Sequence, residues 1–210
     1  MKIPMEMDCE NCGKRMQVFM DLNADRVDYA CSCGHELPGV LTFNLNTGLL
    51  VLRRARYEFK QQHDIPLSMV FAAMAVDCEL SRLYLKWGHI AAFRDRRRIG
   101  DAELEEQLRR LGSATQRLEG VARVMHASGL SDFVLNRPEI RDWIASGFPS
   151  LNAATLAETV TEALFWPRNR ILHVGDTNYD EAAGRKSFNV AQLVLHIYQA
   201  MDAEKRKEPI

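Results

Sequence analysis

The segment FWPRNRILHVGD, residues 165–176, contains three side chains that together could act on a phosphate. Arg168 can grip phosphate oxygens through paired hydrogen bonds, His173 can give or take a proton near neutral pH, and Asn169 can orient either of them. On a helix Asn169 and His173 share a face, and the long Arg168 side chain, about 140° away, can still reach it. This is the equipment for RNA cleavage without a catalytic metal. A base deprotonates the 2′-OH, a cation stabilises the phosphoryl charge and an acid protonates the leaving oxygen.

The same residues also have a purely structural interpretation. Arginine and histidine near the C-terminus of a helix interact favourably with its dipole and its free carbonyls, and an asparagine there can act as a cap. Pro167 removes an amide donor, so the helix is expected to kink or restart at that residue. The spacing alone fits both interpretations.

Four of the five cysteines form a second chemical pattern, C-x2-C followed by eighteen residues and C-x-C. A β-hairpin would bring the two pairs together, and four thiolates would form a closed tetrahedral site that suits one structural Zn²⁺ per chain. Such a site leaves no position for a reactive water, so no metal is expected in catalysis. His35 competes with Cys33 as the fourth ligand, and Cys33 is favoured because Gly34 follows it as Gly13 follows Cys12. The expected ligands are Cys9, Cys12, Cys31 and Cys33.

Composition limits the class of protein. With 47% hydrophobic and 26% charged residues, the chain has the balance of a globular protein and not of a disordered one. The net charge of −1 means that a polyanion must be held by a local basic patch. The N-terminus does not resemble a secretion signal, and no segment approaches ~18 uninterrupted apolar residues. We therefore expect a cytoplasmic protein with no membrane association and with reduced cysteines.

The hydrophobic periodicity divides the chain into four parts. In residues 1–45, alternation over 16–22 and 27–31 around a turn at 23–25 predicts a hairpin with a cysteine pair at each open end, and residues 40–43 suggest a third strand. Residues 46–63 form a connector of uncertain form, and residues 205–210 form a charged tail. Residues 64–204 have the period of helices and are expected to form a helical bundle.

Five helices are expected in this bundle. The first begins at Asp64 and ends by Gly100, and its apolar stripe covers about six turns. A second long helix should run from Asp101 to near Gly129 and pack against the first. A shorter one should begin with Asn136 as N-cap, a fourth should run from about residue 152 into the Arg168 segment, and the last should follow a polar loop at 174–186.

A helical bundle with Arg168, a polar residue and then His173 late in the chain, ahead of a last amphipathic helix, resembles the HEPN superfamily (higher eukaryotes and prokaryotes nucleotide-binding domains). The resemblance covers roughly residues 64–204, and its specific residues are Arg168, Asn169 and His173. It implies an antiparallel helical bundle, usually a homodimer in which two copies of the motif face each other. It also implies a metal-independent endoribonuclease of a toxin–antitoxin or antiviral defence system, with RNA as substrate and an antitoxin or other protein as a further partner.

The resemblance also implies an acid on the first helix near Arg168, for which Asp77 and Glu79 are both candidates. Other members of the family have lost catalysis, so the alternative is a non-catalytic module that binds RNA or a protein and carries a structural zinc ribbon. A basic stretch at 94–98 could add to an RNA groove, although a solvated helix end explains it as well. The residues expected to bind RNA near the motif are Arg170, Tyr179, Arg185 and Lys186.

Overall fold

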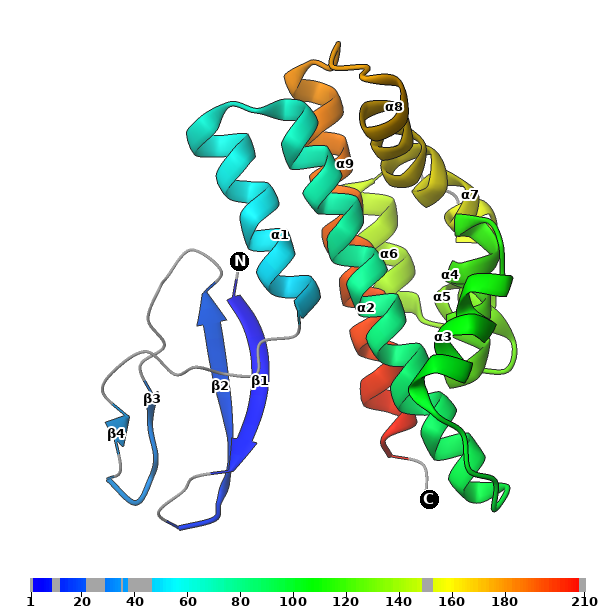
Figure 1. Cartoon of the computed structure of the whole chain (residues 1–210). Helices are drawn as coiled ribbons and strands as arrows, with labels where there is room; N and C mark the ends of the chain where they lie inside the picture. Colours follow the sequence, from blue (N-terminus) through cyan, green and yellow to red (C-terminus); the bar gives the residue numbers. More distant parts are fainter. Residues whose placement is uncertain are drawn as a thin grey trace. The chain divides into compact units, whose positions relative to one another are not determined.

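The computed structural model (Figure 1) describes residues 2–8, 12–21, 29–34, 36–37, 47–148 and 153–207. The chain divides into two compact units, Met1–Leu45 and Asn46–Ile210, which are described separately. The first contains short strands and the second is helical.

The N-terminal unit contains two antiparallel pairs of strands. β1 (Lys2–Asp8) pairs with β2 (Arg15–Asp21), so that Lys2 lies opposite Asp21 and Asp8 opposite Arg15. β3 (Tyr29–Ala30) pairs with β4 (Glu36–Leu37). The expected pairing of residues 16–22 with 27–31 is therefore wrong for the described residues. The alternation of Ile3, Met5 and Met7 was the overlooked signal for the true partner of β2. The predicted turn at 23–25 and strand at 40–43 lie outside the described residues.

The helical unit begins earlier than the sequence pattern suggested. Residues 46–63, expected as a connector of uncertain form, contain α1 (Thr47–Tyr57) and a π turn (Glu58–Gln62). Leu49, Leu52 and Ala55 of α1 are buried, so this segment contributes to the core. α1 packs against α2 (Ile65–Arg94), which Asp64 caps by accepting a hydrogen bond from the Leu67 amide at 2.9 Å. The predicted first helix of the bundle is thus confirmed at its start.

The predicted second long helix is two helices, α3 (Asp101–Arg110) and α4 (Ala114–Met125). Gly112 has a φ of +74°, a left-handed conformation that ends a helix and that glycine adopts most easily. Ser113 then caps α4 through a capping box with Gln116. The Gly-Ser-x-x-Gln sequence was the local signal for this break, and the shared apolar stripe concealed it.

The remaining helices also differ from the prediction in detail. α5 (Gly129–Leu135) was not expected, and Asn136 is its C-cap, while Arg137 is the N-cap of α6 (Pro138–Gly147). A 3-10 turn (Ala153–Thr155), α7 (Leu156–Val160) and a π turn (Thr161–Phe165) lead into α8 (Trp166–Val174). α9 (Glu181–Lys205) begins inside the expected polar loop, because Asp180 caps it by accepting a hydrogen bond from the Ala183 amide at 2.8 Å.

The direction of the helices is mixed. α9 runs parallel to α2, since Gly184 lies against Ile65 near the start of α2 and Asp202 binds Lys86 and Trp87 near its end (Figure 1). The bundle is therefore not wholly antiparallel, because the chain returns through α3 to α8 before α9 begins. A methyl group on Gly184 would come within 2.8 Å of Ile65, so glycine permits this close approach.

The core between α2 and α9 contains a buried charged group, Asp202, whose side chain is 2% exposed. Its Oδ1 accepts hydrogen bonds from Lys86 Nζ at 2.5 Å and from Trp87 Nε1 at 2.8 Å, and Oδ2 binds Arg206. Burial opposes its ionisation, but the hydrogen bonds from Lys86 and Arg206 outweigh that effect and lower the pKa of Asp202. The carboxylate thus ties the end of α2 to the end of α9.

Candidate functional site

The helix that carries the Arg168 segment continues through Pro167. Directly before it, the Trp166 amide donates to the Thr161 carbonyl in the wide spacing of a π turn. Pro167 lies in the first turn of α8, where the missing N–H leaves few hydrogen bonds unmade. α8 ends at Gly175, whose φ is +71°, and the Gly175 and Asp176 amides satisfy the carbonyls of Ile171 and Arg170. The helix restart expected at Pro167 is confirmed.

Arg168 belongs to a cluster of three charged residues from three helices, named here the Asp77 cluster: Asp77 of α2, Arg117 of α4 and Arg168 of α8. Arg168 Nη2 donates to Asp77 Oδ2 at 3.0 Å, and Arg117 Nη1 lies 3.2 Å from Asp77 Oδ1. Two guanidinium groups therefore share one carboxylate, which leaves one positive charge in excess. Burial raises the pKa of Asp77, against the opposing effects of Arg117 and Arg168.

The acid beside Arg168 is Asp77, and Glu79 has a different partner. Glu79 is 1% exposed and binds Arg82 through two hydrogen bonds, at 2.7 and 2.8 Å. Arg117 was not singled out from the sequence, because a lone arginine on an amphipathic helix carries no local pattern. The Nε atoms of Arg117 and Arg168 are buried without a hydrogen-bond partner among the described residues, and unsatisfied buried donors of this kind are rare.

Arg168 also contacts the second residue of the motif. Its Nη1 donates to Asn169 Oδ1 at 3.2 Å, so one guanidinium joins Asp77 and Asn169. Asn169 and His173 lie one turn apart on α8, and both are exposed. In the described part of the chain, the hydrogen bonds of Arg168 go to Asp77 and Asn169 and not to His173. The structure therefore brings Arg168 and Asn169 together and leaves the His173 ring on the outer surface.

The outer face of α8 is rich in exposed apolar side chains. Trp166, Leu172 and Val174 are 57%, 55% and 70% exposed. By helical spacing, Trp166 and Leu172 flank Asn169 and His173 on one side of the helix. We call the residues Trp166, Asn169, Leu172 and His173 the α8 face. It combines the two polar motif residues with hydrophobic surface.

The residues expected to bind RNA lie where α8 ends and α9 begins, but two of them have other contacts. Arg170 Nε donates to Asp176 Oδ2 at 2.8 Å, and its guanidinium carbon lies 5.1 Å from the centre of the Trp166 ring. The hydrogen bond from Arg170 lowers the pKa of Asp176. Arg185 forms an exposed ion pair with Glu181 at 2.6 Å. Lys186 is exposed, and Tyr179 is half-buried, with a buried hydroxyl that lacks a hydrogen-bond partner among the described residues.

The basic stretch at 94–98 does not adjoin this site. It follows the end of α2, whereas Asp77 lies seventeen residues earlier, or about 25 Å along the helix axis. The single RNA groove suggested by the sequence, which joined these arginines to the α8 segment, is therefore wrong as a contiguous surface. The two basic regions lie far apart along α2.

Three of the four expected zinc ligands are described, and they converge. The Sγ atoms of Cys12, Cys31 and Cys33 all lie within 4.8 Å of one another, and those of Cys12 and Cys31 are 3.6 Å apart. Four thiolates around Zn²⁺ at 2.3 Å would be about 3.8 Å apart, so this spacing fits a metal site. Gly34, with a φ of +80°, donates its amide to the Cys31 carbonyl at 2.8 Å in the tight turn.

The other candidate ligands, Cys9 and His35, lie outside the described residues. Cys33, which the sequence favoured over His35, takes part in the cluster. The cysteines lie in the connections of the two strand pairs, Cys12 between β1 and β2 and the others between β3 and β4. Each strand pair therefore supplies one side of a candidate metal centre.

Comparisons with protein-family models, with curated proteins and with solved structures gave no match to this chain. Within the described ranges, no helix has both the length and the apolar character needed to cross a bilayer. The resemblance to the HEPN superfamily thus remains a prediction from the motif and the helical sequence pattern, and the site must be judged by its own chemistry.

Proposed function

We propose that the protein is a metal-independent endoribonuclease, of the kind used in toxin–antitoxin or antiviral defence, that cleaves RNA through attack of a 2′-OH on the adjacent phosphate. The observation that carries the proposal is the arrangement of Arg168. Its guanidinium is held by Asp77 of α2 and touches Asn169, at the base of an exposed helical face that ends with His173. A fixed cation beside an exposed acid–base group is what this reaction needs.

The reaction moves two protons around one phosphorus atom. A base takes the proton of the 2′-OH, the 2′ oxygen forms a new bond to phosphorus, and the bond to the 5′ oxygen breaks as that oxygen is protonated. The products are a 2′,3′-cyclic phosphate and a 5′-OH. Arg168 would offset charge on the non-bridging oxygens, supported by the excess positive charge of the Asp77 cluster, and Asn169 would orient the histidine or the phosphate.

A homodimer fits this chemistry, because the base and the acid act on opposite sides of the phosphorus. In the motif each chain supplies one histidine, His173, and two copies would supply both groups. The hydrophobic members of the α8 face, Trp166 and Leu172, suit burial between two such copies. An antitoxin or another protein covering this face would shut the site, which accords with a toxin under control of a partner.

The nuclease proposal is tested by incubating the purified protein with RNA in excess EDTA. We expect cleavage to persist and the products to carry 2′,3′-cyclic phosphate and 5′-OH ends. A matched RNA with 2′-O-methyl groups should stay intact, because the attacking oxygen is blocked. Cleavage that stops in EDTA, or that leaves 3′-OH and 5′-phosphate ends, would contradict the proposed reaction.

We further propose that the N-terminal unit is a zinc ribbon, in which Cys12, Cys31, Cys33 and Cys9 hold one Zn²⁺. The convergence of three Sγ atoms supports this proposal. Freshly purified protein should contain one zinc per chain by elemental analysis, and Cys31→Ser should lower that content to near zero, since the remaining thiolates bind far more weakly. Cys78→Ser, which changes a cysteine in α2, is the matched control and should retain the metal. Wild-type protein without metal would refute the site.

A second candidate function has its own support. Arg168 is already hydrogen-bonded to Asp77 and Asn169, and these contacts alone would serve to fix α8 against α2. On this alternative the protein is a non-catalytic module that binds RNA or a protein partner. RNA binding by wild-type protein with no cleavage, under conditions where the fold is intact, would favour it over the nuclease.

A further inference from the structure

The turn that follows α2 carries an unusual concentration of arginines. We call residues 93–98, with the sequence Phe-Arg-Asp-Arg-Arg-Arg, the basic turn. The Arg96 amide donates to the Phe93 carbonyl at 3.0 Å and the Arg97 amide to the Ala92 carbonyl at 2.8 Å, which gives the turn a defined backbone. Arg96 has a φ of +54°, in the left-handed region where helices usually end with glycine. An arginine therefore occupies a position where local conformation favours a residue without a side chain.

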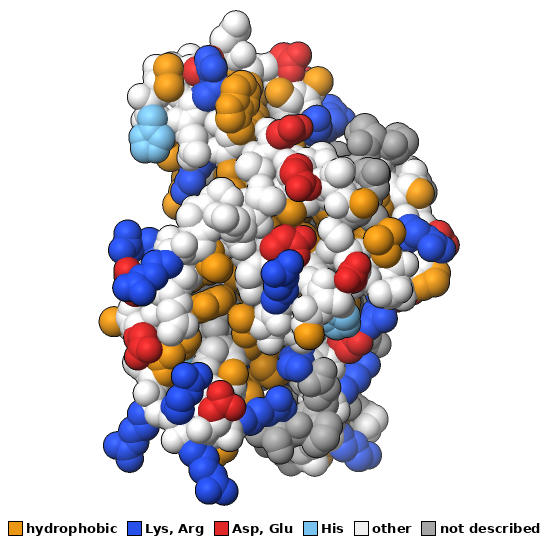
Figure 2. Space-filling model, turned by 90° about the vertical axis from the view of Figure 1, so that its right-hand side faces the viewer, with side chains coloured by type: hydrophobic (Ala, Val, Ile, Leu, Met, Phe, Trp, Pro, Cys, Tyr) orange, Lys and Arg blue, Asp and Glu red, His pale blue; other side chains and the backbone are white. Residues whose placement is uncertain are grey.

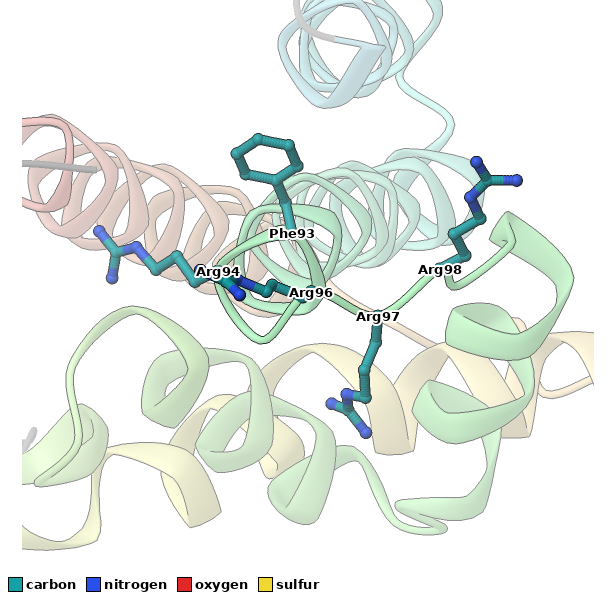
Figure 3. Close-up of a pocket in the computed structure, with 5 residues that line it drawn as sticks. All are labelled: Phe93, Arg94, Arg96, Arg97 and Arg98. Atoms are coloured by element: carbon teal, nitrogen blue, oxygen red, sulfur yellow. The ribbon is translucent and has the colours of Figure 1, made fainter.

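An open hollow of about 620 Å³ lies at the basic turn, lined by Phe93, Arg94, Arg96, Arg97 and Arg98. Phe93 is 76% exposed, the most exposed large hydrophobic side chain of α2. In Figure 3 the side chains of Phe93, Arg97 and Arg98 leave the turn in different directions. The guanidinium groups are thus spread out and do not converge on one point, as they would around a single phosphate. The arrangement suits a polymer that carries a phosphate at each step.

The surrounding charge also favours an anion. Because α2 and α9 run parallel, both end on this side of the helical unit, and α9 ends with Lys205, Arg206 and Lys207. Basic side chains gather at the lower end of the face shown in Figure 2, where acidic ones are fewer. The nearby acids have partners of their own. Asp95 pairs with Arg97 at 3.4 Å, and Asp101 binds His89 at 2.5 Å.

A simple helix-end effect accounts for only part of this pattern. The dipole of α2 favours a cation in the last turn, and Arg94 provides it. Arg96, Arg97 and Arg98 follow the helix end and are exposed, and a dipole effect confined to the last turn does not call for them. It also gives no reason for an exposed phenylalanine among them.

We propose that the basic turn binds single-stranded RNA, with arginines on successive phosphates and Phe93 stacked on an unpaired base. Aromatic side chains among arginines are the usual means of holding a single strand, whereas a paired duplex offers no free base face. The choice of RNA rests on the proposed function, and the site itself is separate from the Asp77 cluster by about 25 Å along α2. At about 3.4 Å per nucleotide, a strand of roughly eight nucleotides would span that distance. The basic turn would then hold substrate RNA away from the cleavage site.

The test measures binding without cleavage. The probe is a fluorescent 2′-O-methyl RNA of about 20 nucleotides, longer than the span above, titrated by anisotropy at salt concentrations from about 50 to 200 mM. The variant Arg96→Ala/Arg97→Ala/Arg98→Ala should bind roughly tenfold to a hundredfold more weakly, and its dependence of log K on log salt should be shallower by about 2, because each lost phosphate contact on a single strand removes about 0.7. Phe93→Ala should weaken binding roughly tenfold with the salt slope unchanged.

The control is Arg109→Ala/Arg110→Ala, which removes two exposed arginines of α3 that pair with Glu106, and it should bind like wild type. Wild-type affinity and slope in the triple variant would overturn the proposal. So would a loss limited to duplex RNA, or binding by the basic turn to phosphatidylserine vesicles with no RNA bound. Failure of the nuclease proposal has a different signature, since RNA would then bind through the basic turn and remain uncut.

Discussion

Replacing His173 by alanine should lower the rate of RNA cleavage by about 10²–10⁴-fold, the usual contribution of a positioned acid or base. The ring is exposed at the end of α8, and none of the hydrogen bonds found among the described residues depends on it. The free energy of unfolding should therefore change by less than about 0.5 kcal/mol. The measurement is the single-turnover cleavage rate in EDTA, together with a urea unfolding curve for each protein.

The matched control is His89→Ala, which changes another accessible histidine, on α2, that binds Asp101 and lies outside the α8 face. It should cleave like wild type. His173→Ala should also retain the RNA affinity that the basic turn provides. If His173→Ala cleaves at the wild-type rate, the histidine has no part in the reaction, and the structural interpretation of the α8 segment gains.

The period of the sequence predicted the buried stripes well. Met69, Ala73, Val76, Leu80, Leu83 and Trp87 of α2 were expected on one face, and all are buried. Boundaries were less predictable, because they depend on local capping that can interrupt a continuous stripe. Gly112 and Ser113 break an apolar pattern that reads as one helix from 101 to 125. Burial follows from periodicity, whereas helix ends follow from a few residues with special backbone or hydrogen-bonding properties.

The candidate site was predictable only in part, for a related reason. Arg168, Asn169 and His173 are close in sequence, so their spacing on one helix could be derived. The choice between Asp77 and Glu79 depends on which face of α2 meets α8, and two residues' difference on a helix is about 200°. Arg117 comes from a third helix, and only the packing of α4 places it beside Asp77. Contacts between distant segments require the fold.

The Asp77 cluster leads to the second large effect. Asp77→Ala would leave Arg117 and Arg168 facing each other without the carboxylate that separates them. Removing one partner of a buried ion pair costs about 3–5 kcal/mol. We expect a loss of unfolding free energy near the lower end, about 3 kcal/mol, because Asp77, Arg168 and Arg117 retain 19%, 24% and 28% exposure. Cleavage should fall by about 10²–10³-fold as well, since Arg168 loses its anchor.

The raised pKa of Asp77 must be weighed against this expectation. Burial raises that pKa, so the folded protein binds this proton more tightly than the unfolded chain does. The contribution from this titration is largest below the ordinary pKa near 3.8 and decreases as the pH rises through the folded value. It measures the cost of ionising Asp77 with both arginines present. The alanine variant instead leaves two buried cations uncompensated, which is a separate and larger penalty, and it should be measured near pH 7.

Asp202→Ala separates the loss of stability from the loss of function. Asp202 is also a buried carboxylate between helices and also binds cations, Lys86 and Arg206, but it lies at the opposite end of α2 from Asp77. Its removal should cost a similar free energy, about 3 kcal/mol, and the folded variant should cleave RNA like wild type. Cleavage must therefore be compared under conditions where urea curves show both variants to be folded. A rate for Asp77→Ala equal to that for Asp202→Ala would mean that Asp77 only stabilises the bundle, whereas a selective loss in Asp77→Ala would tie the position of Arg168 to the reaction.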